Sequence, residues 1–241
     1  MTEVAEARPS ATVVVVREGA DDAEILMVRR HAAASFGNAY AFPGGVLEPA
    51  DAKVHDACRG VTAEQANALL QTPDGLDYYS AAIRELFEET GVLLAESGMS
   101  DDALGVARQR LNDGGLDWQE FLTANSLQLC CDQLTYFSYW ITPDSLQKRY
   151  STRFFFTRLP AGQQASHCGI ELTDCTWMSA TQLLLASRAD KMTMHFPTLN
   201  TIKSLSQHET LDAISDWCAA REQAGVPCIY PNIVDGRPVI R

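Results

Sequence analysis

The sequence lacks the features that mark membrane-spanning, secreted and zinc-binding proteins. Its longest apolar runs, such as Val13–Val16, are far shorter than the ~20 apolar residues that cross a bilayer. Residues 1–10 contain acidic side chains and no apolar core, so no secretory signal is predicted. The seven cysteines include no C-x-x-C pair and the five histidines show no ligand spacing, so neither a disulfide framework nor a zinc site is predicted. We therefore expect a cytoplasmic protein with free thiols and no membrane partner.

Positive charge is also scarce. The chain has 19 lysines and arginines against 31 aspartates and glutamates, a formal net charge of -12. A nucleic-acid interface needs clustered basic side chains to neutralise phosphates, so no nucleic-acid partner is expected. A small phosphorylated molecule is compatible with this balance, because a few arginines and a bound cation are enough to hold one.

The apolar pattern predicts one domain that combines strands and helices. Runs of β-branched and aromatic residues predict strands at 11–17, 25–30, 135–142, 153–159 and 175–178. Apolar residues at helical spacing predict helices at 62–70, 78–89, 104–124, 180–186 and 196–224. No internal repeat or low-complexity linker separates these elements, so a single domain over residues 1–241 is expected. Its additions are an insertion at about 52–76, a helical insertion at about 100–125 and a helical C-terminal part at about 190–225.

Three glutamates, Glu85, Glu88 and Glu89, fall on one face of a predicted helix, because they stand at positions i, i+3 and i+4. Like charges so placed repel one another, and near a helix C-terminus the helix dipole also disfavours them. A hard cation such as Mg²⁺ or Mn²⁺ takes oxygen ligands and would reverse these local electrostatics. A solvated acidic face is the usual explanation for a glutamate pair alone. The upstream Gly44-Gly45 turn and the preceding Arg84 favour the metal site.

Two segments carry a family resemblance. Residues 42–51, Phe-Pro-Gly-Gly-Val-Leu-Glu-Pro-Ala-Asp, resemble the first half of the Nudix box, and residues 84–92, Arg-Glu-Leu-Phe-Glu-Glu-Thr-Gly-Val, resemble its second half. Asp51 stands where the signature has a glutamate. Arg84 follows Gly45 by 39 positions, where the uninterrupted signature has 14, so about 25 extra residues split the box.

A split at this point is a feature of the Nudix subgroup that resembles the mammalian peroxisomal coenzyme A diphosphatases called nudix hydrolase 19. The likeness continues through Leu93-Leu94, the Trp140-x-Thr142-Pro143 element and the tail from Phe196 onward, and covers most of residues 11–235. Because both halves of the box are intact, we expect residues 52–76 to be a surface excursion that shapes the substrate mouth and is dispensable for folding.

The resemblance implies a Nudix fold, an α/β/α sandwich around a mixed β-sheet with additional inserted helices. It implies a metal-dependent pyrophosphohydrolase that cleaves the pyrophosphate bond of a nucleoside diphosphate linked to another moiety. Coenzyme A or acyl-coenzyme A is the leading substrate, and ADP-ribose, NADH and dinucleoside polyphosphates are the alternatives. A non-catalytic Nudix-fold nucleotide sensor is a further alternative, although such proteins typically lose the metal carboxylates. The resemblance does not fix the oligomeric state, and a homodimer is one candidate.

The resemblance also assigns roles to the acidic residues. Glu88 and Glu89, with Glu85 and the carbonyl of Gly44, would hold Mg²⁺ or Mn²⁺, while Arg84 would orient the carboxylates. Such a metal neutralises charge that develops on two phosphates and lowers the pKa of an attacking water. Glu171 is the candidate second acid, as catalytic base or metal ligand, and Glu85 is the other candidate for the base. A solvated loop glutamate is the alternative for Glu171.

Three arginines are candidate substrate ligands, because a guanidinium binds phosphate with two parallel hydrogen bonds. Arg29 and Arg30 end a predicted strand near the box, and Arg153 follows the Trp140-x-Thr142-Pro143 element. A surface charge is the alternative for each of them.

Overall fold

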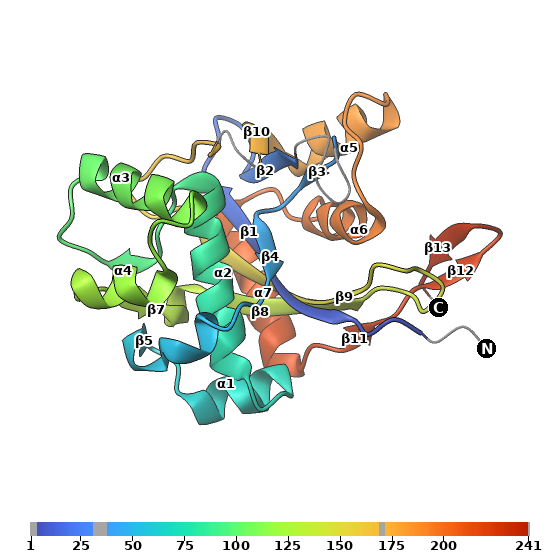
Figure 1. The fold of residues 1–241 in the computed structure, drawn as a ribbon. Helices are drawn as coiled ribbons and strands as arrows, with labels where there is room; N and C mark the ends of the chain where they lie inside the picture. The colour runs from blue at the N-terminus through green and yellow to red at the C-terminus, as the bar shows by residue number, and fades with distance from the viewer. Residues whose placement is uncertain (1–3, 31–37, 169–171, 241) are drawn as a thin grey trace.

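A mixed β-sheet built around the strand β1 (Arg8–Arg17) lies at the centre of the computed structural model, which describes residues 4–30, 38–168 and 172–240 (Figure 1). β1 pairs in parallel with β9 (Tyr150–Arg158). Its other edge is shared by β4 (Gly44–Val46), which pairs with the first part of β1, and β2 (Glu24–Arg30), which pairs with its end. The expected hairpin of β1 and β2 is therefore present, and β4 enters between them.

The described part of this sheet contains eight strands in the order β10-β2-β1-β9-β8-β11, with β3 beside β2 and β4 beside β1. The strands not yet defined are β3 (Tyr40–Ala41), β8 (Thr135–Ile141), β10 (Leu172–Ser179) and β11 (Cys228–Ile229). Two smaller sheets contain β5 (Cys58–Arg59), β6 (Ala95–Glu96) and β7 (Gln128–Cys130), and the hairpin of β12 (Asn232–Val234) and β13 (Arg237–Val239). Short 3₁₀ turns lie at Asp51–Lys53, His55–Ala57 and Cys131–Gln133.

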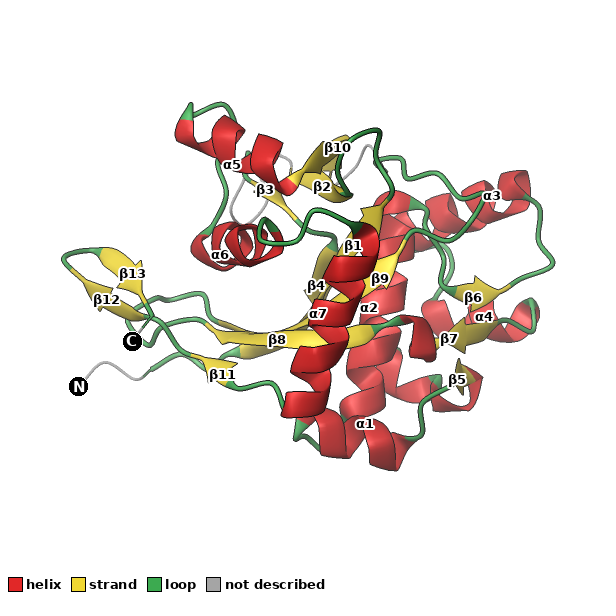
Figure 2. Cartoon of the chain, turned by 180° about the vertical axis from the view of Figure 1, so that it is seen from behind, coloured by secondary structure: helices red, strands yellow, loops and turns green. Residues whose placement is uncertain are grey.

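Helices cover both faces of the sheet (Figures 1 and 2). One layer consists of α1 (Ala63–Leu70), α2 (Gly75–Thr90), α3 (Asp101–Asn112) and α4 (Trp118–Ala124). The other consists of α5 (Ala180–Arg188), α6 (Phe196–Leu205) and α7 (Leu211–Ala224). The expected α/β/α sandwich with a mixed sheet is confirmed. Within the described ranges, no helix has both the length and the apolar character to cross a membrane.

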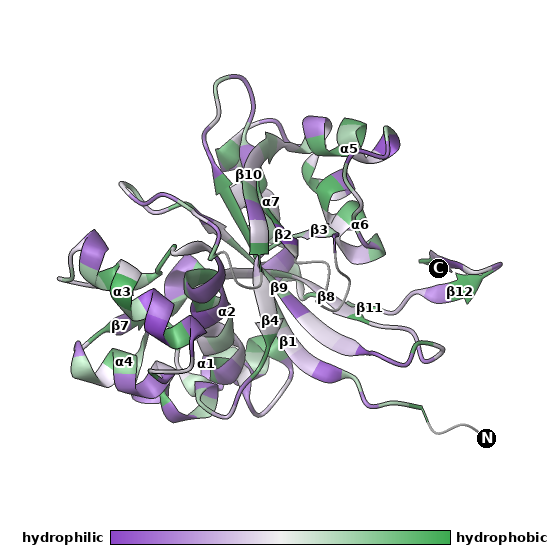
Figure 3. Ribbon diagram, turned by 45° about the horizontal axis from the view of Figure 1, so that its top comes forward, coloured by the Kyte–Doolittle hydropathy of each residue, from purple (hydrophilic) through white to green (hydrophobic). Residues whose placement is uncertain are grey.

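Each face of the sheet has its own hydrophobic core, because successive residues of a strand point to opposite faces. Val13 and Val15 face α2, whereas Val14 and Val16 face the layer of α5, α6 and α7. The four valines are fully buried, as expected for a central strand covered on both sides. The apolar run of β2, residues 25–28, is buried as completely as these valines, and Figure 3 shows green, hydrophobic ribbon in this part of the sheet.

The insertion between the two halves of the box packs into the first core. Its residues Val54, Ala66, Leu70 and Leu76 are buried there. At Gly75 an added Cβ would collide with the backbone of α1, so α1 and α2 lie in close backbone contact. The cavity described below has no lining residue from 52–76. This packing does not agree with the expectation that residues 52–76 are a surface excursion that shapes the substrate mouth and is dispensable for folding. The apolar residues of this segment complete the core on the face of the sheet opposite the cavity.

We expect Leu70→Ala to lower the free energy of unfolding by about 2–5 kcal/mol, because it removes a side chain that is 2% exposed and leaves a cavity. Urea denaturation followed by circular dichroism measures the change. Leu185→Ala is the matched control at a side chain that is 57% exposed, with an expected change of about 0.5 kcal/mol or less. Equal losses in the two variants would show that the insertion is peripheral.

Candidate active site

A cavity of about 940 Å³ lies between the sheet and the first turn of α6 in the described part of the chain. One end contains Gly44, Gly45 and the carboxylates of Glu48, Glu85 and Glu89. The opposite end is apolar, with residues from the β8–β9 turn and the β12–β13 hairpin: Leu146, Pro231, Ile233 and Pro238. A polar end and an apolar end in one cavity suit an amphipathic ligand.

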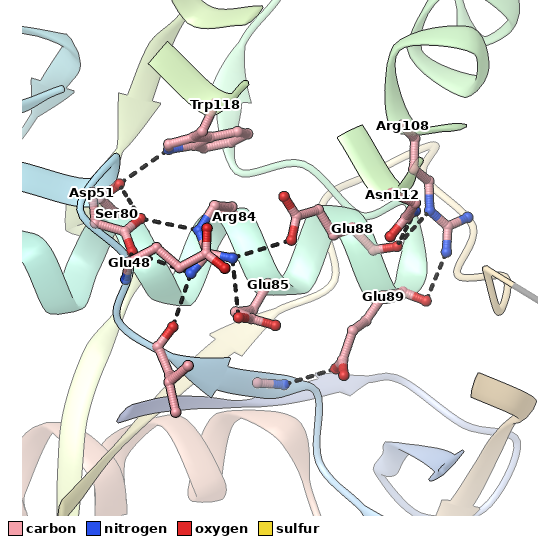
Figure 4. A network of polar contacts seen from close by, with 12 residues as sticks. Glu48, Asp51, Ser80, Arg84, Glu85, Glu88, Glu89, Arg108, Asn112 and Trp118 are labelled. Carbon is pink, nitrogen blue, oxygen red and sulfur yellow. Dashed lines mark hydrogen bonds and ion pairs between the residues drawn. The ribbon is translucent and has the colours of Figure 1, made fainter. Parts of the chain in front are cut away.

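The helix α2 sets the direction of the glutamates. Leu86 and Phe87 are buried in the first core and fix the rotation of the helix about its axis. Glu85 and Glu89, one turn apart, then extend towards β4 (Figure 4). The carboxylate of Glu89 accepts a hydrogen bond from the backbone N–H of Gly44 at 2.8 Å. The helix ends at Gly91, whose φ of 77° is the left-handed conformation that favours glycine.

The glycines of β4 allow the backbone to approach these carboxylates. Gly44 has a φ of 148°, and a Cβ there would lie 2.7 Å from the Cα of Thr12 on β1. A Cβ on Gly45 would fall onto the carboxylate of Glu85, 2.6 Å from its Oε2 atom. The turn therefore forms a cradle beside Glu85 that a side chain would fill.

Arg84 holds the carboxylates in place from inside the protein. Its guanidinium, which is 2% exposed, uses all five N–H groups. Nε and Nη2 donate to the two carboxylate oxygens of Asp51 at 3.1 Å, and Nη2 also donates to the carbonyl of Val46 at 3.0 Å. Nη1 donates to Glu85 at 3.0 Å and to Glu88 at 3.1 Å. Burial lowers the pKa of Arg84, but Glu85 and Asp51 outweigh this effect and keep the pKa above its ordinary value.

Asp51, which is fully buried, is the counter-ion of Arg84 and accepts hydrogen bonds from two further residues (Figure 4). It accepts hydrogen bonds from the hydroxyl of Ser80 at 2.9 Å and from the backbone N–H of Glu48 at 2.8 Å. The indole of Trp118 donates to the Ser80 hydroxyl at 3.0 Å. Asp51, which stands where the Nudix signature has a glutamate, therefore still reaches Arg84.

Glu88 differs from its two neighbours on α2. It is not among the residues that line the cavity, and its carboxylate accepts the hydrogen bond from Arg84. Burial, with the nearby carboxylates of Glu85 and Glu48, raises the pKa of Glu88 to about 7 against the opposing effect of Arg84. Glu85 accepts a hydrogen bond from the same Nη1 group, so this contact alone does not separate Glu88 from the other predicted metal ligands, and the role of Glu88 as a ligand stays a prediction.

The helix α3 supplies hydrogen-bond donors to the backbone carbonyls at the C-terminal end of α2. Arg108 donates to the backbone carbonyls of Glu88 at 3.0 Å and Glu89 at 2.6 Å, and Asn112 donates to the Glu88 carbonyl at 3.1 Å. A cation at this end opposes the negative end of the helix dipole, which would otherwise disfavour the glutamates. The sequence offers no local signal for this contact, because Arg108 lies 20 residues from Glu88.

Among the residues predicted to form the site, the structure brings Glu85, Glu89 and Gly44 to one end of the cavity. Glu171 lies outside the described residues, and so does the side chain of Arg30. Glu48, which was not assigned a role in the sequence, also lines the cavity. The one indication of this in the sequence is that Glu48 lies within the first half of the Nudix box.

The two remaining candidate arginines, Arg29 and Arg153, are not among the residues that line the cavity. The guanidinium of Arg29 lies 5.8 Å from the ring centre of Tyr40. Arg153 is 5% exposed, stacks on Tyr139 at 3.7 Å and donates to the backbone carbonyl of Leu70 at 3.0 Å. Arg153 therefore attaches α1 to the sheet on the face opposite the cavity.

The oxygen atoms at the polar end of the cavity are ligands of the kind that a hard divalent cation binds. Carboxylate and carbonyl oxygens are what Mg²⁺ and Mn²⁺ prefer, and the cradle beside Gly45 leaves room next to Glu85. Within the described ranges, no group of three or more Asp, Glu, His or Cys side chains is already arranged to hold a metal ion. Glu85, Glu89 and the Gly44 carbonyl are the groups that would hold the ion.

We expect Asp51→Asn to lower the free energy of unfolding by about 3 kcal/mol, because it removes the charge that compensates a buried guanidinium. Chemical denaturation measures the loss. Asp212→Asn breaks the exposed ion pair with Arg158, whose partners are 81% and 46% exposed, and should cost less than about 1 kcal/mol. If Asp51→Asn costs no more than this control, Asp51 does not anchor Arg84.

Comparison with known proteins agrees with this geometry. A family model described as the NUDT19 Nudix domain matches residues 56–205, more than half of the chain. A Caenorhabditis elegans protein named as a candidate nudix hydrolase 7 is 26% identical over 194 residues, 80% of this chain and 57% of that protein. The Xenopus laevis acyl-coenzyme A diphosphatase NUDT19 is 24% identical, with 81% of this chain and 66% of that protein covered.

The fold matches a solved structure over nearly its whole length. The crystal structure of a NUDIX hydrolase from Alicyclobacillus acidocaldarius has a TM-score of 0.76 and 28% identity, and the match covers 88% of this chain and 97% of that one. The chain spans 57% and 66% of the lengths of the two relatives named above. The chain therefore belongs to the Nudix hydrolase family, and its matched region is a NUDT19 Nudix domain.

Proposed function

We propose that this protein is a divalent-metal-dependent hydrolase that cleaves the pyrophosphate bond of coenzyme A or acyl-coenzyme A. The observation that carries the proposal is the position of Glu85 and Glu89, beside the Gly44-Gly45 turn, at the polar end of the large cavity. Family membership supports the reaction class, and the likeness to a protein named acyl-coenzyme A diphosphatase supports the substrate.

Glu85 and Glu89, with the carbonyl of Gly44, would hold Mg²⁺ or Mn²⁺. When bound, the cation offsets the charge of the two phosphates and lowers the pKa of a water. Arg84 keeps Glu85 extended towards β4 through the 3.0 Å hydrogen bond, so the carboxylate does not need to reorganise. Glu171 is proposed as the base or an additional ligand, and Glu85 is the alternative base.

The size and lining of the cavity suit a long substrate. At about 940 Å³ it lies near the upper end of the range of small-molecule sites, which is roughly 300–1,000 Å³. From Thr12, which faces Gly44 across the sheet, β1 continues for four residues to Arg8, roughly 13 Å at about 3.3 Å per residue. Beyond Arg8 lies the apolar wall of Leu146 and Ile233. A diphosphate at Glu85 would thus leave room for the pantetheine arm and an acyl chain.

A substrate panel tests the proposed reaction. With Mg²⁺ or Mn²⁺, coenzyme A and water should give 4′-phosphopantetheine and adenosine 3′,5′-bisphosphate, identified by product mass. The panel also contains an acyl-coenzyme A, ADP-ribose, NADH and a dinucleoside polyphosphate. We expect the highest kcat/KM for coenzyme A or its thioester. Turnover confined to one of the other three would reject the substrate but keep the reaction class, and no turnover with any member would reject both.

We expect Glu85→Gln and Glu89→Gln each to lower kcat by at least about 10²-fold, because each removes a charge next to the reacting phosphates. Electron paramagnetic resonance should show weaker Mn²⁺ binding in the same variants. Glu120→Gln is the matched control, since Glu120 is an exposed glutamate on α4. Wild-type turnover in a folded Glu89→Gln variant would contradict the assignment of the site.

A further inference from the structure

A second, smaller cavity lies between the sheet and the helices α6 and α7. Its volume is about 390 Å³, which falls within the range of small-molecule sites, roughly 300–1,000 Å³. β8 supplies Phe137, Ser138 and Trp140 to its wall, and α7 supplies Trp217 and Arg221. Aromatic rings beside polar and charged groups suit a ligand that itself combines a ring with a charge.

The charged side chains on the wall of this smaller cavity are cations. Lys203 and Arg221 both line it, whereas its described lining residues include no aspartate or glutamate. This wall contrasts with the formal net charge of -12 of the whole chain and with the glutamates that line the larger cavity. Two cations without a carboxylate around one cavity produce a local positive potential, which favours an anionic ligand.

Arg221 is held in a way that leaves its terminal groups to a ligand. Its Nε donates to the backbone carbonyl of Phe137 at 2.9 Å, and its guanidinium lies 5.1 Å from the ring centre of Trp217. Neither Nη1 nor Nη2 has a hydrogen bond or an ion pair with any residue that the structure describes, and the same is true of the Lys203 ammonium group. A guanidinium fixed through one nitrogen can use the other two for the parallel hydrogen bonds that bind a phosphate.

We propose that the smaller cavity binds a nucleoside monophosphate. Lys203 and Arg221 bind the phosphate, and the base packs against the half-buried indole of Trp217. A phosphate alone would use the two cations but leave the aromatic wall uncovered, whereas a planar base stacks on such rings. This binding does not depend on the proposed function, because the site is separate from the cavity that contains Glu85 and Glu89.

The two cavities share part of their walls. Trp140 lines both, and α6 contributes Phe196 to the larger cavity and Asn200 to the smaller one. The Ser138 hydroxyl accepts a hydrogen bond from the Trp140 indole at 2.9 Å, and the Asn200 amide donates to the Phe196 carbonyl at 2.8 Å. A ligand in the smaller cavity lies beside the side chains that hold these two aromatic residues, so it should also change the KM of the substrate. This second effect rests on the proposed function.

Calorimetric titration of the metal-free full chain with AMP tests the binding. Without a cation, the glutamates of the larger cavity disfavour a phosphate there, so the titration reports on the smaller cavity. Ribose 5-phosphate lacks the base and adenosine lacks the phosphate, and we expect each to bind at least about tenfold more weakly than AMP.

Lys203→Gln and Arg221→Gln should each weaken AMP binding by about tenfold. Lys191→Gln is the matched control, because it removes the same charge from an exposed lysine that does not line this cavity. Arg8→Gln removes the basic residue that lines the larger cavity and should leave AMP binding unchanged. If Arg221→Gln does not fold, Lys203→Gln at an exposed position still tests the site.

The proposal is overturned if AMP binds no better than ribose 5-phosphate or adenosine, if both cavity variants bind AMP as the wild type does, or if Arg8→Gln or Lys191→Gln loses as much. For the second effect, AMP should change the KM of the substrate in the wild type and in Lys191→Gln but not in Lys203→Gln. An equal change in Lys203→Gln would reject the coupling. Weaker AMP binding in Lys203→Gln, in a protein that turns over no member of the substrate panel, would retain the site and reject the proposed function.

Discussion

Arg84 is the side chain on which the geometry of the site depends. A buried guanidinium costs several kcal/mol unless it is paired and fully hydrogen-bonded, and here all five donors are used. Its acceptors come from both halves of the split box: Val46 and Asp51 precede the insertion, and Glu85 and Glu88 follow it. One side chain thus fixes the glycine turn against α2, whatever the length of chain between them.

The three glutamates of α2 take different parts in this arrangement. Glu85 and Glu88 both accept a hydrogen bond from Nη1 of Arg84, whereas Glu85 and Glu89 line the cavity. The helix that carries them is held by two further contacts: Trp118 supports the Arg84 network through Ser80, and Arg108 binds the carbonyls at the C-terminus. The segments that carry Trp118 and Arg108 therefore stabilise a helix whose acidic face is unfavourable by itself.

The sequence predicts what depends on local spacing and leaves out what depends on distant contacts. The α/β/α sandwich, the β1–β2 hairpin and α2 with its glycine end follow from apolar periodicity and the Nudix resemblance. The parallel pairing of β1 with β9, the burial of Leu70 and the Arg108 contact join residues far apart in the chain, so no local pattern reports them.

The central claim is that Glu85, Glu89 and Gly44 form the divalent-cation site of a Nudix hydrolase. Anomalous diffraction from crystals soaked in Mn²⁺ tests it most directly. The account predicts a manganese peak within roughly 2.5 Å of the Glu85 and Glu89 carboxylates and the Gly44 carbonyl, a coordination distance for a hard divalent cation. A fully occupied manganese site elsewhere, with none at these three residues, would contradict it.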